Sequence, residues 1–250
     1  MSAVAAAIAA PAGALVGLGA GWLSILLERV EGLEAEDRED REAYEQEVAQ
    51  ATVQAADAGE AAPIVEPWPY ERYGWTRLER VLSPLLGAVG FAAFAAHETI
   101  GGGLVIHLLW VSLFVLIVCF DLKHRLILNR VTYPAIVVAL ALSLVSPGLT
   151  FWRALIGSVA IAAFFVIQNL ISRGSIGLGD AKLGALIGAT CGIGADLNHI
   201  GAVYAVIYAV FLGGAVALLL LMFRLRGLKD PIPYGPFLCA GASLILFQGP

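Results

Sequence analysis

Long apolar segments separated by short polar connections dominate the pattern of hydrophobic and polar residues along this chain. A transmembrane helix needs about 20 mostly apolar residues, and somewhat fewer when it is short or buried in a bundle. The pattern therefore predicts an all-α fold, a polytopic membrane bundle of about eight transmembrane helices. The eight segments lie at 3–27, 81–97, 101–120, 131–147, 151–172, 183–196, 200–223 and 235–248.

The sixth segment, 183–196, is short and rich in glycine. Glycine lets helix backbones approach closely, so this composition suits a helix packed against its neighbours better than one that faces lipid. We therefore expect it to lie inside the bundle. Its glycines are Gly184, Gly188, Gly192 and Gly194.

One sizeable extramembrane piece interrupts the pattern and divides the chain into three parts. We expect the first transmembrane helix at 1–28, a small acidic loop domain at 29–80 and a seven-helix membrane domain at 81–250. Within the loop, residues 28–47 are rich in helix-forming residues, whereas 52–63 are rich in Ala, Gly and Pro and are typical of a linker. A solvated charged helix with a flexible tail is favoured over a binding role.

The composition indicates a membrane protein. Of its 250 residues 59% are hydrophobic and 14% charged, and the mean hydropathy is +0.83, values far from those of soluble domains. The net charge is −5, and 15 of the 20 acidic residues lie between Glu28 and Glu79, which excludes a nucleic-acid-binding surface. The three cysteines are isolated in apolar segments, so neither a disulfide framework nor a metal site is expected from them. No basic residue precedes Glu28, so we expect the N-terminal segment to stay as a membrane anchor rather than act as a signal peptide.

The basic residues are distributed unevenly between the two sides of the membrane. With eight spans, fourteen of the fifteen lie on one side and only Arg153 lies on the other. Because cytoplasmic loops are enriched in Lys and Arg, we expect four basic loops in the cytoplasm and both termini outside it. The fourteen are Arg29, Arg38, Arg41, Arg72, Arg77, Arg80, Lys123, Arg125, Arg130, Arg173, Lys182, Arg224, Arg226 and Lys229.

Two aspartates lie where apolar segments meet the predicted cytoplasmic face. Asp121 comes directly at the end of the third span, and Asp180 comes just before the sixth. Two carboxyl groups that approach closely share one proton, and such a pair can activate a water as base and acid. The structural alternatives are an ion pair of Asp121 with Lys123 or Arg125, and a helix N-cap at Asp180.

A glycine-rich segment, 174–180, leads into Asp180. Its glycines permit tight turns and the close approach of another chain, so an extended peptide could dock beside the acid. An ordinary turn between helices is the alternative, because two glycines separated by one residue are a weak signal by themselves.

Three motifs together resemble the type IV prepilin peptidases, which are GxGD-type intramembrane aspartyl proteases. The segment 121–134 is similar to the family's first active-site motif from its aspartate to its proline, without a gap. The segment 177–183 reads G-L-G-D-A-K-L and matches G-x-G-D-x-K-L in full, and P-Y-G-P-F at 233–237 resembles the family's C-terminal motif. The resemblance runs from about 13 to 240.

The resemblance implies that Asp121 and Asp180 are the catalytic pair of an aspartic-type endopeptidase. Its substrates would be type IV prepilins or type II secretion pseudopilins, which lose a short basic leader at the cytoplasmic face of the bacterial inner membrane. The peptidase would need no cofactor, whereas S-adenosylmethionine would be required only if N-methylation of the new N-terminus is retained. The motif residues implied around the substrate cleft are Gly177, Gly179, Lys182, Asn129, Thr132, Pro134, Pro233, Gly235 and Pro236.

Two departures from the family pattern change what the resemblance implies. Leu128 and Asn129 stand where Pro and Asp are common, and neither is the catalytic position. The first loop contains no cysteine and no histidine, whereas many members bind zinc there through two CxxC pairs. Since zinc requires thiolate or imidazole ligands, we expect no metal site in this loop.

Several smaller assignments remain open at this stage. We expect His97 and His107 to pack or to form hydrogen bonds. His124 lies closer to Asp121, but a basic loop that faces anionic lipid explains it equally well. Lys182 either influences which carboxyl group of the aspartate pair holds the shared proton, or anchors its loop at the membrane surface. The C-terminal L-F-Q-G-P carries no functional weight.

Two other functions remain as alternatives to the peptidase. A multi-pass transporter would use intramembrane aspartates for proton or cation coupling, and an inactive homologue would serve as an assembly scaffold. The expected partners are a prepilin or pseudopilin and the lipid bilayer, without nucleic acid, and the oligomeric state is open.

Overall fold

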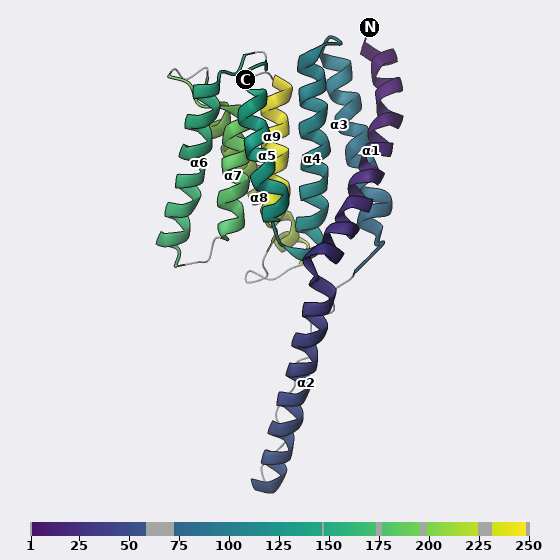
Figure 1. The fold of residues 1–250 in the computed structure, drawn as a ribbon, viewed down its shortest axis with the longest axis vertical. Coiled ribbons are helices and arrows are strands. Elements are labelled where there is room, and N and C mark those ends of the chain that lie inside the picture. Colours follow the sequence, from purple (N-terminus) through teal and green to yellow (C-terminus); the bar gives the residue numbers. More distant parts are fainter. Residues whose placement is uncertain are drawn as a thin grey trace.

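The computed structural model describes residues 2–58, 73–146, 148–173, 177–195, 199–224 and 232–248. Within these ranges every regular element is helical, which confirms the all-α polytopic bundle. One helix, α2 (Leu33–Ala58), projects from an end of the bundle (Figure 1). The elements are α1 (Ser2–Glu31), α2 (Leu33–Ala58), the π-helical turn η1 (Leu78–Leu82), α3 (Ser83–His97), α4 (Gly102–His124), α5 (Asn129–Leu142), α6 (Phe151–Ile171), α7 (Leu178–Cys191), α8 (Gly201–Met222) and α9 (Gly235–Gln248).

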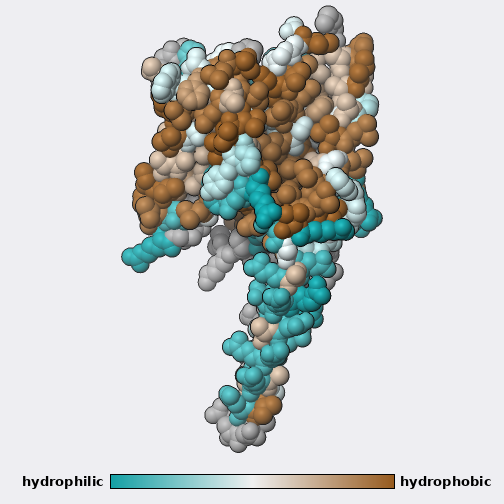
Figure 2. All heavy atoms as spheres, viewed as in Figure 1, coloured by the Kyte–Doolittle hydropathy of each residue, from teal (hydrophilic) through white to brown (hydrophobic). Residues whose placement is uncertain are grey.

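Each of the eight predicted apolar segments contains a helix, but the helices differ in length. Five helices within the described residues are long and apolar enough to cross a membrane: α1, η1 continued by α3, α4, α6 and α8. The other three, α5, α7 and α9, have 14 residues each and are therefore about 21 Å long, shorter than the hydrocarbon core of a bilayer. The visible face of the bundle is predominantly hydrophobic, whereas α2 is predominantly hydrophilic (Figure 2).

The position of α7 differs from the sequence prediction, although its close packing is confirmed. It begins at Leu178 and ends at Cys191 instead of spanning 183–196, because Gly192 adopts a positive φ of 70° that ends the helix. At its contact with α6, a Cβ on Gly188 would lie 2.1 Å from the carbonyl oxygen of Gly157. Only glycine permits this approach of the two backbones.

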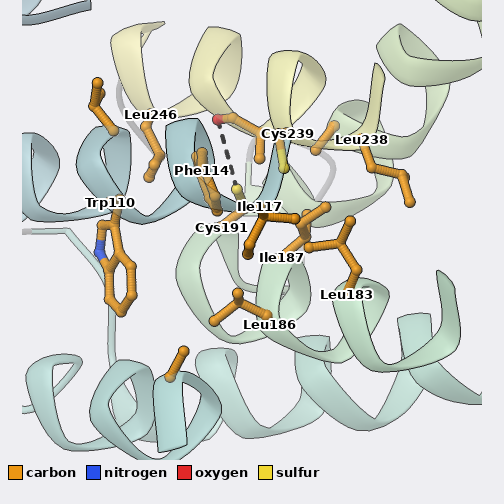
Figure 3. Packing of buried hydrophobic residues seen from close by; sticks show 14 of the residues in the cluster. Trp110, Phe114, Ile117, Leu183, Leu186, Ile187, Cys191, Leu238, Cys239 and Leu246 are labelled. Atoms are coloured by element: carbon orange, nitrogen blue, oxygen red, sulfur yellow. Dashed lines mark hydrogen bonds between the residues drawn. The ribbon is translucent and has the colours of Figure 1, made fainter. Parts of the chain in front are cut away.

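The buried core joins α4, α7 and α9, three helices that are far apart in the sequence (Figure 3). Trp110, Phe114 and Ile117 from α4 lie against side chains of α7 and α9, and the Sγ of Cys191 lies 3.9 Å from the carbonyl oxygen of Ala242. Since α4 ends where α7 and α9 begin, this packing brings three motif-bearing helix ends to one end of the bundle. We call it the α2 end, because α2 projects from it (Figure 1).

The first loop contains a longer helix than the sequence predicts. After α1 ends at Glu31, Gly32 adopts a φ of 71° and α2 follows at once. The predicted linker is wrong for residues 52–58, which continue α2, because alanine has the highest helix propensity and no glycine or proline occurs there. The remaining linker residues, 59–63, lie outside the described residues.

The helix α1 begins and the helix α9 ends at the end of the bundle opposite α2 (Figure 1). Given the basic residues at the α2 end, we predict that Glu39→Cys on α2 reacts with a membrane-impermeant maleimide only after cells are permeabilised. Ile100→Cys, at a position 84% exposed between α3 and α4, should react in intact cells. The native Cys119, Cys191 and Cys239 are buried, so they should give little background. Labelling of Glu39→Cys in intact cells would reverse the orientation.

Candidate active site

The two aspartates predicted as a pair meet at the α2 end of the bundle. Asp121 lies in the last turn of α4 and is 5% exposed, whereas Asp180 is half-buried in the first turn of α7. Their charges are close enough to interact electrostatically. Both residues lie inside helices rather than just outside them, because α4 continues to His124 and α7 begins before Asp180. We refer to them below as the aspartate pair.

Local backbone structure at each helix end places these carboxyl groups. Arg125 adopts a left-handed φ of 53°, and its N–H donates to the carbonyl oxygen of Asp121 at 2.8 Å, which ends α4 directly after the acid. Gly177 caps α7 with an extended backbone, and the N–H of Asp180 donates to its carbonyl oxygen at 3.1 Å. A carboxylate in the first turn of a helix also interacts favourably with the helix dipole.

The third motif contributes a hydrogen bond to the pair. The backbone N–H of Gly235, at the start of α9, donates to Oδ2 of Asp121 at 3.1 Å. A Cβ on Gly235 would lie 2.6 Å from that same oxygen, so the contact leaves no room for a side chain. The glycine of the 233–237 motif is therefore explained by its contact with Asp121.

We predict that Gly235→Ala lowers activity at this site by about 10²-fold, because the new methyl group must displace the Asp121 carboxyl group and weaken its hydrogen bond. Gly214→Ala on α8 is the matched control, since a Cβ there meets nothing within 4 Å. The rate of substrate turnover measures the effect, and circular dichroism should show both variants folded. Equal rates for the two variants would mean that this contact is unimportant.

A hydrogen bond between Lys182 and Asn129 joins the first two motifs. The Nζ of Lys182 donates to Oδ1 of Asn129 at 2.6 Å and lies 5.8 Å from the ring centroid of Tyr133. The described contacts of Lys182 are thus with the start of α5, and they hold α5 and α7 together beside the pair. Asparagine and aspartate both offer an acceptor oxygen. This hydrogen bond is therefore compatible with Asn129 at a position where the motif often has Asp.

The remaining motif residues lie at different distances from the pair. Gly177 is exposed, and a Cβ there would lie 4.0 Å from Oδ2 of Asp180. Gly179 packs against Ile127, and the buried Thr132 donates to the carbonyl oxygen of Leu128 at 2.9 Å within its own helix turn.

The three motif prolines differ in their surroundings. Pro134 lines an apolar groove between α1, α4 and α5, whereas Pro236 lines another apolar groove, between α3 and α9. Pro233 is half-buried in the segment that precedes α9.

Tyr234 is a residue near the pair that sequence reasoning missed as a site residue. Burial and the nearby charge of Asp180 raise the pKa of its phenol, and its ring lies 6.4 Å from the rings of both Phe165 and Phe237. Its position inside the 233–237 motif was the only signal that could have identified it.

A buried charged cluster lies beside the pair and corrects one sequence alternative. Lys123 does not pair with Asp121: its Nζ donates to Glu28, to Oε1 of Glu79 at 2.9 Å and to the carbonyl oxygen of Gly74 at 2.8 Å. The three charged side chains are 0–4% exposed. We call Glu28, Glu79 and Lys123 the charged cluster. It joins α1, η1 and α4 because each helix end supplies one member.

The histidines are held by protein contacts. Of the two alternatives for His124, the lipid-facing one is wrong, because its side chain is 3% exposed, its Nε2 lies 3.1 Å from Oε1 of Glu28, and its ring stacks on Tyr73. His97 stacks on Phe247 and His107 lies 2.5 Å from Glu98, so their expected packing and hydrogen-bonding roles are confirmed.

The chemistry available at the α2 end is that of two interacting carboxyl groups with one backbone donor. Within the described ranges, no group of three or more His, Cys, Asp or Glu residues is arranged to hold a metal ion. Two carboxyl groups that share a proton can hold a water between them, one as base and the other as acid.

Comparison with known proteins agrees with the sequence motifs. The type IV leader peptidase family matches residues 107–219, which include both aspartates. The leader peptidase HopD of Escherichia coli is 32% identical over 145 residues, covering 55% of this chain and 89% of HopD. No solved structure matches the chain.

Two other relatives match over a smaller share of their length. The prepilin leader peptidase/N-methyltransferase of Bacillus subtilis is 26% identical over 165 residues, which cover 66% of this chain and 64% of that protein. The protein of the same name from Xanthomonas campestris is 26% identical over 134 residues, covering 52% and 45%. This chain thus spans less than two thirds of either protein. From the HopD match, the family match and the three motifs, the chain belongs to the type IV leader peptidase family.

Proposed function

We propose that this chain is an intramembrane aspartyl endopeptidase that removes the basic leader from type IV prepilins or type II secretion pseudopilins. The observation that carries the proposal is the meeting of Asp121, Asp180 and the N–H of Gly235 at one end of the bundle. We place this end at the cytoplasmic face of the bacterial inner membrane, because the basic residues gather there.

The proposed reaction uses a water held between the two carboxyl groups. In this mechanism one carboxyl group is protonated and the other is a carboxylate, as expected where two such groups share one proton. The Gly235 N–H donates to Oδ2 of Asp121 and thereby fixes the orientation of that carboxyl group beside the water. The carboxylate takes a proton from the water as it attacks the scissile carbonyl, and the protonated group donates to the carbonyl oxygen, which gives a tetrahedral diol. The C–N bond then breaks as the newly protonated group donates to the leaving nitrogen and the other carboxylate takes a proton back from the diol, which restores the pair.

The surroundings of the pair support a peptide substrate with a basic leader. Gly177 is exposed next to Asp180 and itself places no side chain beside this acid, which suits the approach of an extended peptide. The helix α2, which projects from the same end, carries Glu and Asp over most of its first half, and opposite charge steers the encounter of a basic segment.

Co-expression with candidate prepilins from the same genome tests the proposal directly. The leader's loss, read by mass spectrometry of the pilin, is the expected result. A transporter that uses these aspartates for ion coupling would leave every candidate prepilin uncleaved. The position of both aspartates at helix ends on one side, rather than near the bundle centre, disfavours that alternative.

We further propose that cleavage is not followed by dependable N-methylation. Among the described residues of the first loop, 33–58 form the single helix α2, in which residues 33–55 are exposed or half-buried, and the buried acids Glu28 and Glu79 are already bound to Lys123. These residues therefore do not fit a site for S-adenosylmethionine.

The same mass measurement checks this expectation. Mature pilin should lack the added mass of one methylene, about 14 Da, even when S-adenosylmethionine is supplied, and metal chelators should leave cleavage unchanged. A mass increase of the mature pilin that requires both this protein and S-adenosylmethionine would contradict the proposal on methylation. It would leave the peptidase proposal intact.

A further inference from the structure

An apolar groove runs along the bundle between α3 and α9, with α4 as its floor and α8 at one edge. It encloses about 680 Å³. Leu82, Leu122 and Pro236 line it near the α2 end, and Phe94 and Phe247 line it towards the opposite end. Since Pro236 and Phe247 lie eleven residues apart on one helix, the groove is about 16 Å long.

The groove begins beside the aspartate pair. Leu122 directly follows Asp121, and Pro236 directly follows Gly235, whose N–H donates to Asp121. Cys239, a further lining residue, lies one helical turn after Gly235 on α9. A chain leaving the pair towards the bundle centre would therefore enter this groove at its α2 end.

The geometry leads us to infer that this groove holds the hydrophobic helix of the prepilin substrate, with the N-terminal end of that helix at Asp121. The inference rests on the proposed function. If the leader is removed at the membrane surface, the scissile bond must lie at the level of the aspartate pair. The apolar helix that follows this bond in the substrate must then lie within the membrane. Residues with a small side chain or none line the groove and let a helix approach closely. They are Gly90, Ala93, Ala240 and Ser243.

A second apolar groove is a poorer fit to the same helix. It lies between α1, α4 and α5 and encloses about 440 Å³. Its lining on α4 ends at Leu116, five residues or about 7.5 Å before Asp121. A helix seated there would not bring its end to the pair along α4. This groove therefore provides an internal control.

Tryptophan substitutions separate the two grooves. Ala240→Trp places a large side chain in the α3–α9 groove at an exposed position of α9. We expect it to raise KM for the prepilin cleaved in the co-expression assay by about tenfold, while kcat stays within about twofold. Gly19→Trp, in the second groove, and Ala160→Trp, at an exposed position of α6, should change neither constant.

Each other outcome overturns the inference. A fall in kcat with unchanged KM would mean that Ala240→Trp disturbs the pair, and an unchanged KM would mean that the groove is empty or filled by lipid. A KM raised by Gly19→Trp instead would place the helix in the second groove. If the unsubstituted chain cleaves no prepilin, the proposed function itself fails, which is a different result.

Cross-linking provides a measurement that does not depend on turnover. In the Asp180→Asn background, Leu244→Cys in the groove should form a disulfide with a cysteine in the middle of the prepilin's apolar helix. Leu170→Cys, 71% exposed on α6, is the matched control and should form none. Equal cross-linking at both positions would show that the helix has no preferred groove.

Discussion

Asp121→Asn and Asp180→Asn are each expected to lower leader cleavage by about 10³-fold or more, because general acid–base catalysis contributes that much and neither amide can exchange the required proton. Asparagine keeps the shape of the side chain, so both variants should remain inserted and folded. The measurement is the fraction of prepilin that has lost its leader, determined by mass at matched protein levels.

The controls for this prediction are acids away from the pair. Asp40→Asn, at an exposed position of α2, should cleave at the unsubstituted rate. Asp196, which the sequence places on the opposite side and which lies outside the described residues, should also be dispensable. Because the pair acts as one unit, the double variant should be no slower than either single variant. Cleavage near the unsubstituted rate in either single variant would remove the pair from the mechanism.

Lys123→Met is expected to destabilise the protein by about 3–5 kcal/mol, because it leaves two buried carboxylates without their shared cation. Glu28 and Glu79 are 4% and 0% exposed, so water cannot replace the lost ammonium. For a chain of this size such a loss should lower the midpoint of thermal unfolding in detergent by about 10 °C. Since Lys123 lies two residues after Asp121, cleavage should fall as α4 loses its fixed end.

Two comparisons isolate the role of the charged cluster. The triple variant Glu28→Gln, Lys123→Met and Glu79→Gln should recover part of the lost stability, because it removes the uncompensated charges together. Arg41→Met breaks a pair with Glu45 in which both side chains are more than half exposed, and it should leave the midpoint unchanged. A midpoint for Lys123→Met equal to that of Arg41→Met would show that the cluster is solvated.

The helix-to-helix contacts were beyond prediction from the hydrophobic pattern. A helix that is apolar on all sides, such as α4, does not show which face packs on protein and which faces lipid. Lys123 illustrates the consequence. Its nearest acid in the sequence is Asp121, but its partners are Glu28 and Glu79, which are 95 and 44 residues away.

The boundaries of the short helices were also decided by local structure within the fold. Hydropathy predicts α7 from 183, because the polar Asp180 and Lys182 interrupt the apolar run. In the structure both residues belong to α7, since Asp180 lies in its first turn and Lys182 is bound to Asn129. Polar side chains with partners at a helix end are compatible with a helix that their hydropathy alone would exclude.

The sequence by itself determined the membrane class, the eight apolar helices, the basic side of the bundle and the two aspartate motifs. These properties follow from residue types and spacing, because a bilayer requires long apolar helices and sorts positive charge to one side. The tertiary structure alone decided that Gly235 binds Asp121, that Lys182 binds Asn129, that Lys123 neutralises Glu28 and Glu79, and that an apolar groove opens beside the pair. Each of these depends on how α4, α7 and α9 pack against one another and against α1 and α3, which the pattern of any single segment cannot specify.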